Sequence, residues 1–241
     1  MNARENQPPR SAFVTGGNRG IGLAIARSLA ESGRRVSITY RQSPPPPGFT
    51  AVRCDVTDGA DLERALEEVS AGQGPPEIIV SNAGIMHSTV ITATDPKSWN
   101  AIMDTNITPA YRIARASVSG MLAAGWGRII LLSSVVGLTG SPGQAAYTTS
   151  KAAMIGLART LAWELGPHGI TANVVAPGVI DTRMAEGIRP KRREQFITMT
   201  PLRRYGTPRE VAETVRFLAS EEASYITGAV IPVSGGLGMG L

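Results

Sequence analysis

Short apolar runs alternate with longer stretches in which apolar residues recur every three or four positions along nearly the whole chain. The short runs are typical of buried strands, and the longer stretches are typical of amphipathic helices. Strands that alternate with helices indicate right-handed crossovers and a parallel sheet covered on both faces. We therefore predict a single α/β domain with a doubly wound parallel sheet. The predicted strands cover 11–15, 35–40, 49–54, 77–81, 128–133, 171–176 and 228–232, and the predicted helices 21–30, 58–70, 95–124, 145–165 and 207–219.

Two segments fall outside this alternation. Residues 1–10 are polar and are predicted to form a flexible tail before a single domain of residues 11–241. Between Gly178 and Arg204 the chain is irregular and basic. No repeat or shift in composition divides the domain further, and Pro109 marks a point at which the long third helix can break.

Composition narrows the functional classes. The chain has 241 residues and no apolar run near the ~18 residues of a membrane-spanning helix. Its amino terminus lacks the apolar core of a secretory signal. The single cysteine, Cys54, excludes an internal disulfide, and with only His87 and His168 beside it we expect no metal site. These features favour a cytoplasmic protein.

The charge of the chain is basic. The formal net charge is +5, and 21 of the 24 basic residues are arginine. This balance suits an anionic partner such as nucleotide phosphates, an acidic carrier protein or nucleic acid. A general coding preference for arginine on a solvated surface explains the same charge. No nucleic-acid motif accompanies it, and we expect neither nucleic acid nor a membrane as a partner.

A glycine-rich turn joins the first predicted strand to the first predicted helix. Glycines let the backbone turn tightly and let a pyrophosphate approach main-chain N–H groups at a helix N-terminus. The position of the turn at the start of a β–α–β series favours a Rossmann-type dinucleotide site over an ordinary loop. The residues expected to bind the cofactor here are Thr15, Gly16, Asn18, Arg19, Gly20, Ile21 and Gly22.

The end of the second predicted strand determines which dinucleotide is preferred. An NAD site places an Asp or Glu there for the ribose 2′-hydroxyl, whereas this chain has Thr39, Tyr40 and Arg41. Arg19 and Arg41 are suited to bind a 2′-phosphate through charge-assisted hydrogen bonds. The alternative is that both are solvated surface arginines. The missing carboxylate and the two cations together favour NADPH.

Tyr147 and Lys151 lie four residues apart in a predicted helix, so the phenol and the ammonium project from one face. A tyrosine ionises near pH ~10, and a nearby ammonium lowers its pKa toward the range of acid–base catalysis. Such a pair taken alone is usually structural. Two features favour a catalytic pair here. Ser134 ends a predicted strand, where it is placed to bond a substrate carbonyl, and Lys151 is one of only three lysines.

Further motifs occur in the same order and at matching spacing. They are Ser81-Asn82-Ala83-Gly84, Asn106 and Pro177-Gly178. With the glycine turn and the Tyr/Lys pair, they make residues 11–241 resemble the short-chain dehydrogenase/reductase family. Within it, the sequence is most similar to the 3-oxoacyl-acyl-carrier-protein reductases, including their mycolate-pathway members. The resemblance implies a homotetramer paired through the 145–165 and 207–219 helices.

The resemblance also implies a role for each of these residues. Tyr147 is expected to protonate the carbonyl oxygen of a ketone while Ser134 holds that oxygen. Lys151 is expected to bind the nicotinamide ribose and to lower the pKa of Tyr147, and Asn106 to anchor a water in the proton relay. The remaining cofactor contacts that it implies are Asp55, Val56, Asn82, Ala83, Gly84, Pro177, Gly178, Ile180 and Thr182.

In the family, residues around 180–204 form a lid over the substrate. The residues expected to line it are Met184, Ile188, Met199 and Leu202. The cations at 189–193 are interpreted either as a docking surface for an acidic carrier protein or as a solvated loop, with nucleic-acid targeting a distant third.

Three positions bear on the substrate. Arg128 matches a basic position near the mouth of the site, whereas His168 stands at a position that is basic in some carrier-protein reductases. Ser234 replaces the aspartate of the family's V-D-G-G motif, and nothing in the sequence explains it.

The predicted function is the NADPH-dependent reduction of a ketone, a 3-oxoacyl thioester on a carrier protein, to the hydroxy product. A ketoreductase of a polyketide or other secondary-metabolite pathway fits the same residues. The non-enzyme alternative is an NADPH-binding redox-sensing regulator, although such proteins generally lack the Tyr/Lys pair.

Overall fold

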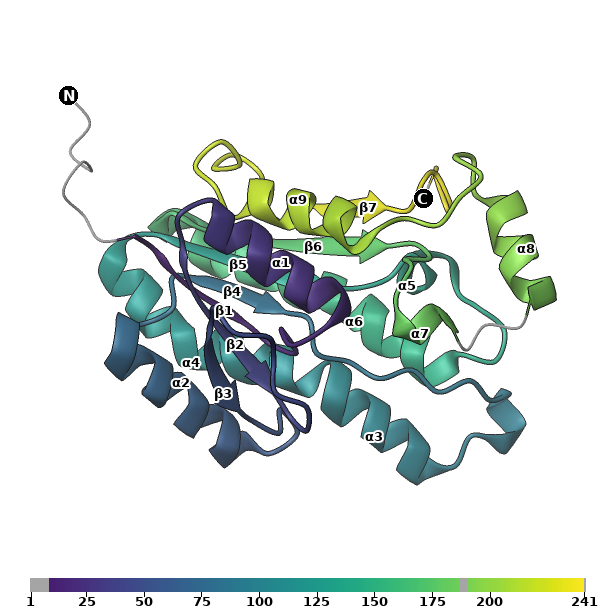
Figure 1. Ribbon diagram of the computed structural model, residues 1–241, viewed down its shortest axis with the longest axis horizontal. Helices are drawn as coiled ribbons and strands as arrows, with labels where there is room; N and C mark the ends of the chain where they lie inside the picture. The colour runs from purple at the N-terminus through teal and green to yellow at the C-terminus, as the bar shows by residue number, and fades with distance from the viewer. Residues whose placement is uncertain (1–8, 187–189, 241) are drawn as a thin grey trace.

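The computed structural model describes residues 9–186 and 190–240. Within these residues, seven parallel strands form one sheet in the order β3-β2-β1-β4-β5-β6-β7 (Figure 1). The doubly wound parallel fold predicted from the sequence is confirmed. The strands are β1 (Ser11–Val14), β2 (Arg35–Tyr40), β3 (Thr50–Arg53), β4 (Ile78–Ser81), β5 (Gly127–Leu132), β6 (Ile170–Pro177) and β7 (Val230–Val233).

Helices cover both faces of the sheet (Figure 1). Helices α1 and α9 pack on one face, and α2, α4 and α6 pack on the other. None of the helices in the described part of the chain is long and apolar enough to cross a membrane. The helices are α1 (Gly20–Glu31), α2 (Gly59–Gln73), α3 (Pro96–Asn106), α4 (Thr108–Ala124), α5 (Val136–Thr139), α6 (Ala145–Leu165), α7 (Arg183–Glu186), α8 (Pro190–Met199) and α9 (Pro208–Leu218), with 3₁₀ turns η1 (Ile91–Ala93) and η2 (Gly166–His168).

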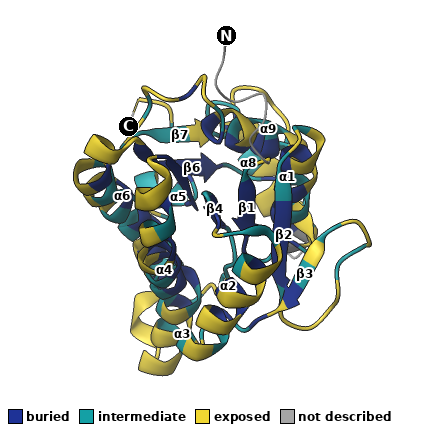
Figure 2. Ribbon diagram, turned by 90° about the vertical axis from the view of Figure 1, so that its left-hand side faces the viewer, coloured by how far each residue is buried: buried dark blue, intermediate teal, exposed yellow. Residues whose placement is uncertain are grey.

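Strand β1 shows how the sheet divides the core. Ala12 and Val14 belong to the buried cluster under α1 and α9, whereas Phe13 between them belongs to the cluster under α2, α4 and α6. Successive side chains of a strand point to opposite faces, so a strand buried on both sides is apolar at every position. The central strands are accordingly buried along their length (Figure 2).

Polar caps fix where several helices begin. Asp58, predicted near the start of α2, accepts hydrogen bonds from the backbone N–H groups of Ala60 and Asp61. Thr207 and Glu210 form a reciprocal capping box at the start of α9. Each of these bonds satisfies a backbone N–H that has no partner inside the helix.

One helical segment agrees with the prediction and one differs from it. The helix predicted over 95–124, with a break point marked at Pro109, is two helices, α3 and α4, which are separated at Ile107, and Pro109 lies in the first turn of α4. The segment predicted as irregular after Gly178 contains α7 and α8. Helix α8 has no buried residue, so its sequence lacks the periodic apolar face on which the prediction depended.

The folded domain begins before the predicted boundary. The Arg10 carbonyl accepts a hydrogen bond of 3.0 Å from the Arg35 N–H. The Arg10 guanidinium pairs with Glu77 and stacks on the Trp126 ring at 3.4 Å. Arg10 is therefore part of the domain and not of a flexible tail. The first eight residues of the predicted tail lie outside those that the structure describes.

Candidate active site

The glycine turn lies where the order of the sheet reverses. Strands β1 and β4 are neighbours, and their chains leave in opposite directions along the sheet, which opens a crevice at their carboxyl ends. The Thr15 hydroxyl accepts hydrogen bonds of 3.0 Å from the Asn82 and Ala83 N–H groups. The Asn82 side chain in turn donates to the Thr15 carbonyl at 2.8 Å and to the Gly16 carbonyl at 3.2 Å. Two predicted cofactor segments are thus tied together across the crevice.

Two glycines of the turn are required by its geometry. Gly16 has a φ of 62°, a conformation that residues with a side chain rarely adopt. A Cβ at Gly22 would overlap the Gly16 carbonyl and lie 2.5 Å from Asn82 Nδ2. Helix α1 then begins at Gly20, and Arg19 before it makes no side-chain cap. Backbone N–H groups at the start of α1 therefore remain available to phosphate oxygens, which fits a dinucleotide.

The two arginines predicted to bind a 2′-phosphate are both at the surface. Arg19 and Arg41 are exposed, and Arg41 Nη1 lies 3.9 Å from Asp55 Oδ2. Asp55 accepts hydrogen bonds from the Thr57 hydroxyl at 2.7 Å and the Thr57 N–H at 3.0 Å, which hold the pKa of its carboxyl below the usual value. Val56 beside it is buried. The structure therefore brings Arg41 close to Asp55, a cofactor contact that the family resemblance implies.

Ser134 and Tyr147 form a hydroxyl pair at the end of β5. Ser134 Oγ accepts from the Val136 N–H at 3.4 Å and reaches the Pro177 carbonyl at 3.5 Å. Burial raises the pKa of the Tyr147 phenol, and a side-chain hydrogen bond with Ser134 lowers it by a smaller amount. The desolvated phenol thus holds its proton firmly at neutral pH.

Lys151 is a buried cation below this pair. Its side chain is 4% exposed, and Nζ donates a 2.7 Å hydrogen bond to the Leu132 carbonyl. Burial lowers the pKa of Lys151 from 10.5 to about 8. Nζ lies 5.8 Å from the centre of the Tyr147 ring. The two side chains share one face of α6, as their spacing predicts.

One expectation about this pair is wrong for the structure described. Lys151 was expected to lower the pKa of Tyr147, but the lowering contribution comes from the Ser134 hydroxyl and burial outweighs it. The physical reason is the burial of the phenol, because desolvation disfavours its charged form. The pKa of Tyr147 is consequently raised.

Asn106 connects helix α6 to the loop after β4. Its Oδ1 accepts from the Ile85 N–H at 2.8 Å, and its Nδ2 donates to Ser150 Oγ at 2.9 Å. Ser150 donates at 2.7 Å to the Tyr147 carbonyl. A Cβ at Gly84 would lie 3.2 Å from Asn106 Oδ1 and 3.5 Å from Lys151 Nζ. Asn106 thus lies between the loop at Gly84 and Ile85 and the α6 residue Ser150.

Two serines in this cluster were missed by the sequence analysis. Ser150, fully buried, links Asn106 to Tyr147, and Ser133 Oγ donates at 2.7 Å to the Lys151 carbonyl. The signal was present for Ser150, because it lies three residues after Tyr147 and so on the same side of the helix. Ser133 had no comparable signal.

The end of β6 and the segment after it pack against the loop after β5, the carboxyl-terminal turn and the start of α1. The Pro177 carbonyl accepts from the Val135 N–H at 2.8 Å, and a Cβ at Gly178 would lie 2.8 Å from Ser234 Cα. Ile180 is buried, and Thr182 Cγ2 lies 3.7 Å from the position of a Cβ at Gly20. Thr182, one of the predicted cofactor contacts, therefore lies beside the start of α1.

Backbone hydrogen bonds and close packing fix both ends of the predicted lid. The Gly206 carbonyl accepts from the Asp181 N–H at 2.8 Å, which joins the two ends of the lid. The Gly235 carbonyl accepts from the Leu202 N–H at 3.1 Å, and a Cβ at Gly236 would lie 2.7 Å from Pro201 Cγ. The carboxyl-terminal turn therefore packs against the lid.

Four residues were predicted to line the lid, and the structure describes the side chains of two of them. The side chain of Met184 and residues 187–189, which include Ile188 and Arg189, lie outside the described part of the structure. Met199 and Leu202 are exposed, at 64% and 63%.

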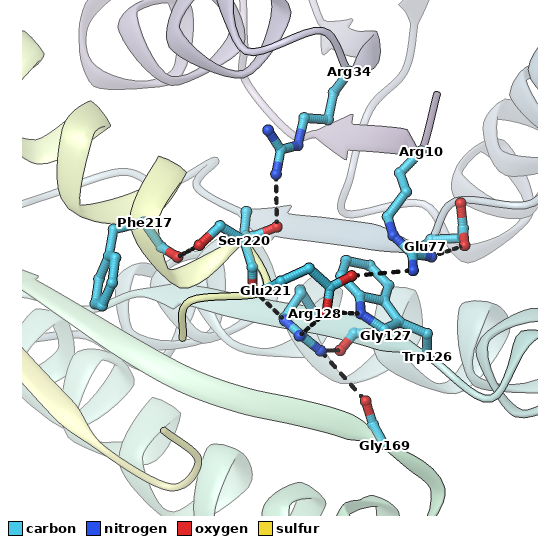
Figure 3. A network of polar contacts seen from close by, with 11 residues as sticks. Arg10, Arg34, Glu77, Trp126, Gly127, Arg128, Gly169, Phe217, Ser220 and Glu221 are labelled. Atoms are coloured by element: carbon cyan, nitrogen blue, oxygen red, sulfur yellow. Dashed lines mark hydrogen bonds and ion pairs between the residues drawn. The ribbon is translucent and has the colours of Figure 1, made fainter. Parts of the chain in front are cut away.

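The prediction that Arg128 lies near the mouth of the site is wrong. Arg128 is the second residue of β5, so it lies at the amino edge of the sheet, opposite Ser134, and is 1% exposed. Figure 3 shows its guanidinium beneath Trp126 and bonded to surrounding carbonyls. His168 precedes β6 at the same edge. Neither residue lies at the edge that holds the Ser134 and Tyr147 hydroxyls. The carbonyls that Arg128 contacts are those of Gly127 at 2.9 Å, Ser220 at 3.2 Å and Gly169 at 3.3 Å.

The fold and the site together define a class of protein. A dinucleotide-type glycine turn and a Ser–Tyr–Lys cluster share the carboxyl edge of one doubly wound sheet. The family profile described as Enoyl-(Acyl carrier protein) reductase matches residues 16–238. The chain belongs to the short-chain dehydrogenase/reductase family and is an oxidoreductase.

Individual relatives narrow this assignment. The chain is 47% identical over 237 residues to the 3-oxoacyl-[acyl-carrier-protein] reductase MabA of Mycobacterium tuberculosis, covering 97% of this chain and 96% of MabA. It is 39% identical over 236 residues to FabG of Escherichia coli, which carries the same enzyme name, over 95% and 97% of the two chains. A crystal structure from Agrobacterium tumefaciens, provisionally assigned as a gluconate dehydrogenase, matches with a TM-score of 0.89 at 30% identity, over 96% of this chain and 97% of that chain. The protein is thus a homologue of MabA and FabG.

Proposed function

We propose that this chain reduces the 3-keto group of an acyl thioester on a carrier protein, with NADPH as the reductant. The product is the 3-hydroxyacyl thioester. The observation that carries the proposal is the Ser134–Tyr147 hydroxyl pair beside buried Lys151, at the edge where the glycine turn begins. The names of the relatives MabA and FabG support the choice of substrate.

The residues of the crevice fit the proposed cofactor. The open glycine turn and the uncapped start of α1 suit a pyrophosphate, with Asn82 holding the turn in place. Arg19 and Arg41 are exposed cations at the end where a 2′-phosphate would lie, and β2 ends without a carboxylate. These features favour NADPH over NADH.

Tyr147 acts as the proton donor in this proposal. Its raised pKa keeps the phenol protonated at neutral pH, so it has a proton to give to a carbonyl oxygen. Ser134 contacts the same phenol, so an oxygen placed between the two hydroxyls accepts from both. Bound NADPH supplies the hydride. The negative charge that develops on the carbonyl oxygen is neutralised by the proton of Tyr147.

Lys151 acts as a buried hydrogen-bond donor beside the hydroxyl pair. With a pKa of about 8 it is mostly protonated at neutral pH, and beyond its bond to the Leu132 carbonyl its ammonium has donors for the ribose of the bound cofactor. Asn106 and Ser150 hold α6 against the loop after β4, which fixes where the phenol and the ammonium lie.

Steady-state oxidation of NADPH with an acetoacetyl thioester of a carrier protein tests the proposal. We expect turnover with a higher kcat/KM for NADPH than for NADH. A preference for NADH would overturn the assignment of the cofactor. A higher kcat/KM for a bicyclic ketone than for the acetoacetyl thioester would replace the substrate by a polyketide-type ketone, and binding of NADPH with no reduction of any ketone would favour a sensor.

A further inference from the structure

The net charge of the chain is concentrated in one short segment. Residues 180–206 hold seven of the 24 Lys and Arg and three of the 19 Asp and Glu, a net charge of +4 out of the +5 of the whole chain. A general preference for arginine would spread the excess over the surface. The remainder of the chain is nearly balanced, so the excess charge belongs to the lid and calls for a local explanation.

Helix α8 of the lid presents two cations that no carboxylate neutralises among the described residues. Lys191 and Arg192 are both exposed, and Arg192 stacks at 4.8 Å on the Phe196 ring. Arg193 next to them differs, because it pairs with Asp181 at 3.7 Å and so helps to hold the lid together. The helix therefore carries one structural cation and two that face solvent.

The position of α8 places these cations beside the site. The helix projects beyond the edge at which β6 and β7 end, next to the carboxyl-terminal turn (Figure 1). The lid from which it projects begins over the glycine turn, where Thr182 approaches Gly20. Met199 at the end of the helix and Leu202 after it are both exposed, so two apolar side chains are available close to the cations in the sequence. A protein bound to α8 would thus stand at the edge of the sheet where the catalytic hydroxyls lie.

We propose that the exposed face of α8 is the docking surface for an acidic carrier protein that delivers the acyl thioester. This inference rests on the proposed function, because it requires a carrier-linked substrate. Opposite charges accelerate encounter and fix the orientation of a partner, and unpaired rim cations near a site provide both. The exposed side chains of Met199 and Leu202 accommodate the non-polar part of the contact.

The double variant Lys191→Glu/Arg192→Glu tests this surface. Both residues lie in the first turn of α8, where acidic side chains favour a helix, so the variant keeps the helix. The Arg193–Asp181 pair is left intact. We expect KM for an acetoacetyl carrier thioester to rise by about tenfold or more with little change in kcat. The KM for acetoacetyl pantetheine, which is uncharged, stays within about twofold, since rim charges steer charged partners only.

A matched control has the same change in charge elsewhere. Arg27 on α1 and Arg115 on α4 are exposed and far from α8 in the sequence, so Arg27→Glu/Arg115→Glu alters net charge equally. We expect this control to leave both KM values close to those of the parent. Added salt should raise the KM of the parent for the carrier thioester and have a weaker effect on the α8 variant.

Each outcome of the comparison decides the inference. An unchanged KM for the carrier thioester, an equal rise with both thioesters, or an equal rise in the control overturns the docking surface. If the parent reduces neither thioester, the proposed function fails. Direct binding of the holo carrier to the parent and to the α8 variant then decides docking by itself, and equal affinities would overturn it.

Discussion

Two buried cations lie at opposite edges of the same sheet and are held very differently. Arg128 at the amino edge donates to three backbone carbonyls, approaches Glu221 at 3.7 Å and stacks on Trp126 at 4.1 Å. Lys151 at the carboxyl edge donates, among the described residues, to the Leu132 carbonyl. Both side chains are almost fully buried.

The different numbers of partners of Arg128 and Lys151 indicate different roles for the two edges of the sheet. A buried cation surrounded by acceptors and a carboxylate is fixed in place and ties elements together. A buried ammonium with three donors and one carbonyl partner has donors left for a ligand, and desolvation lowers its pKa to about 8. The contacts of Arg128 favour a role in stability for the amino edge, and the contacts of Lys151 suit the proposed chemistry at the carboxyl edge.

The largest effect that this comparison predicts is on the phenol. In Tyr147→Phe the proton donor is lost, so we expect kcat to fall by about 10³–10⁴-fold, since general acid–base catalysis contributes ~10²–10⁴-fold. Affinity for NADPH, measured by fluorescence titration, should change little. Tyr225→Phe, at a fully exposed tyrosine, is the matched control. A Tyr147→Phe enzyme that retained a substantial share of kcat would remove the carboxyl edge from the chemistry.

The next effect belongs to the amino edge. Arg128→Met leaves three backbone carbonyls and the Trp126 face without their partner, so we expect the free energy of unfolding to drop by about 4 kcal/mol. Urea unfolding measures it, with Arg27→Met at an exposed site as the control. Below the unfolding transition, kcat should match the parent. A selective loss of kcat with normal stability would contradict the division between the edges.

Lys151→Met should separate stability from activity. The folded pKa of about 8 lies below 10.5, so the charged side chain costs about 3 kcal/mol at pH 7, which the variant recovers while it loses activity. Between pH 8 and 10.5 the unfolded parent binds more protons than the folded parent, so the parent gains stability relative to the variant. We expect the advantage of the variant to shrink to about 1 kcal/mol at pH 10. A constant difference in urea unfolding at both pH values would refute the lowered pKa.

The smallest predicted effect concerns the choice of cofactor. Arg41→Ala removes one charge-assisted donor and leaves Asp55, 3.9 Å from Arg41 in the parent, without its cation. We expect the ratio of kcat/KM for NADPH over NADH to fall by roughly 10–100-fold, equivalent to a lost hydrogen bond to a charged group. Arg115→Ala serves as the control. An unchanged ratio would show that Arg41 is a surface arginine.

Local pattern was enough to predict most of the fold. The apolar spacing over 145–165 coincides with α6, and the alternation over 35–40 coincides with β2, because both elements bury one or both faces in the core. Helix α8 could not be predicted in this way, since it buries nothing and a charged surface has no period.

In the candidate site, too, spacing along the sequence predicts some features, whereas packing between elements determines others. The spacing of Tyr147 and Lys151 determines that they share a face, and the glycine turn is recognisable from its place between strand and helix. The direction of the Lys151 ammonium depends on how α6 packs against β5, which spacing does not encode. The error on Arg128 arose from matching a residue type while ignoring its place at the start of a strand, which in a parallel sheet is the edge away from the ligand.

The carboxyl-terminal turn has a practical consequence for exchanging parts between relatives. The Gly235 carbonyl accepts a hydrogen bond from the Leu202 N–H, and there is no room for a side chain at Gly236 against Pro201. The conformation of the lid therefore depends on that of the carboxyl-terminal turn. A chimera that exchanges only residues 180–206 would pack the lid of one protein against the carboxyl-terminal turn of another. Substrate preference would transfer between family members only when residues 234–240 travel with the lid.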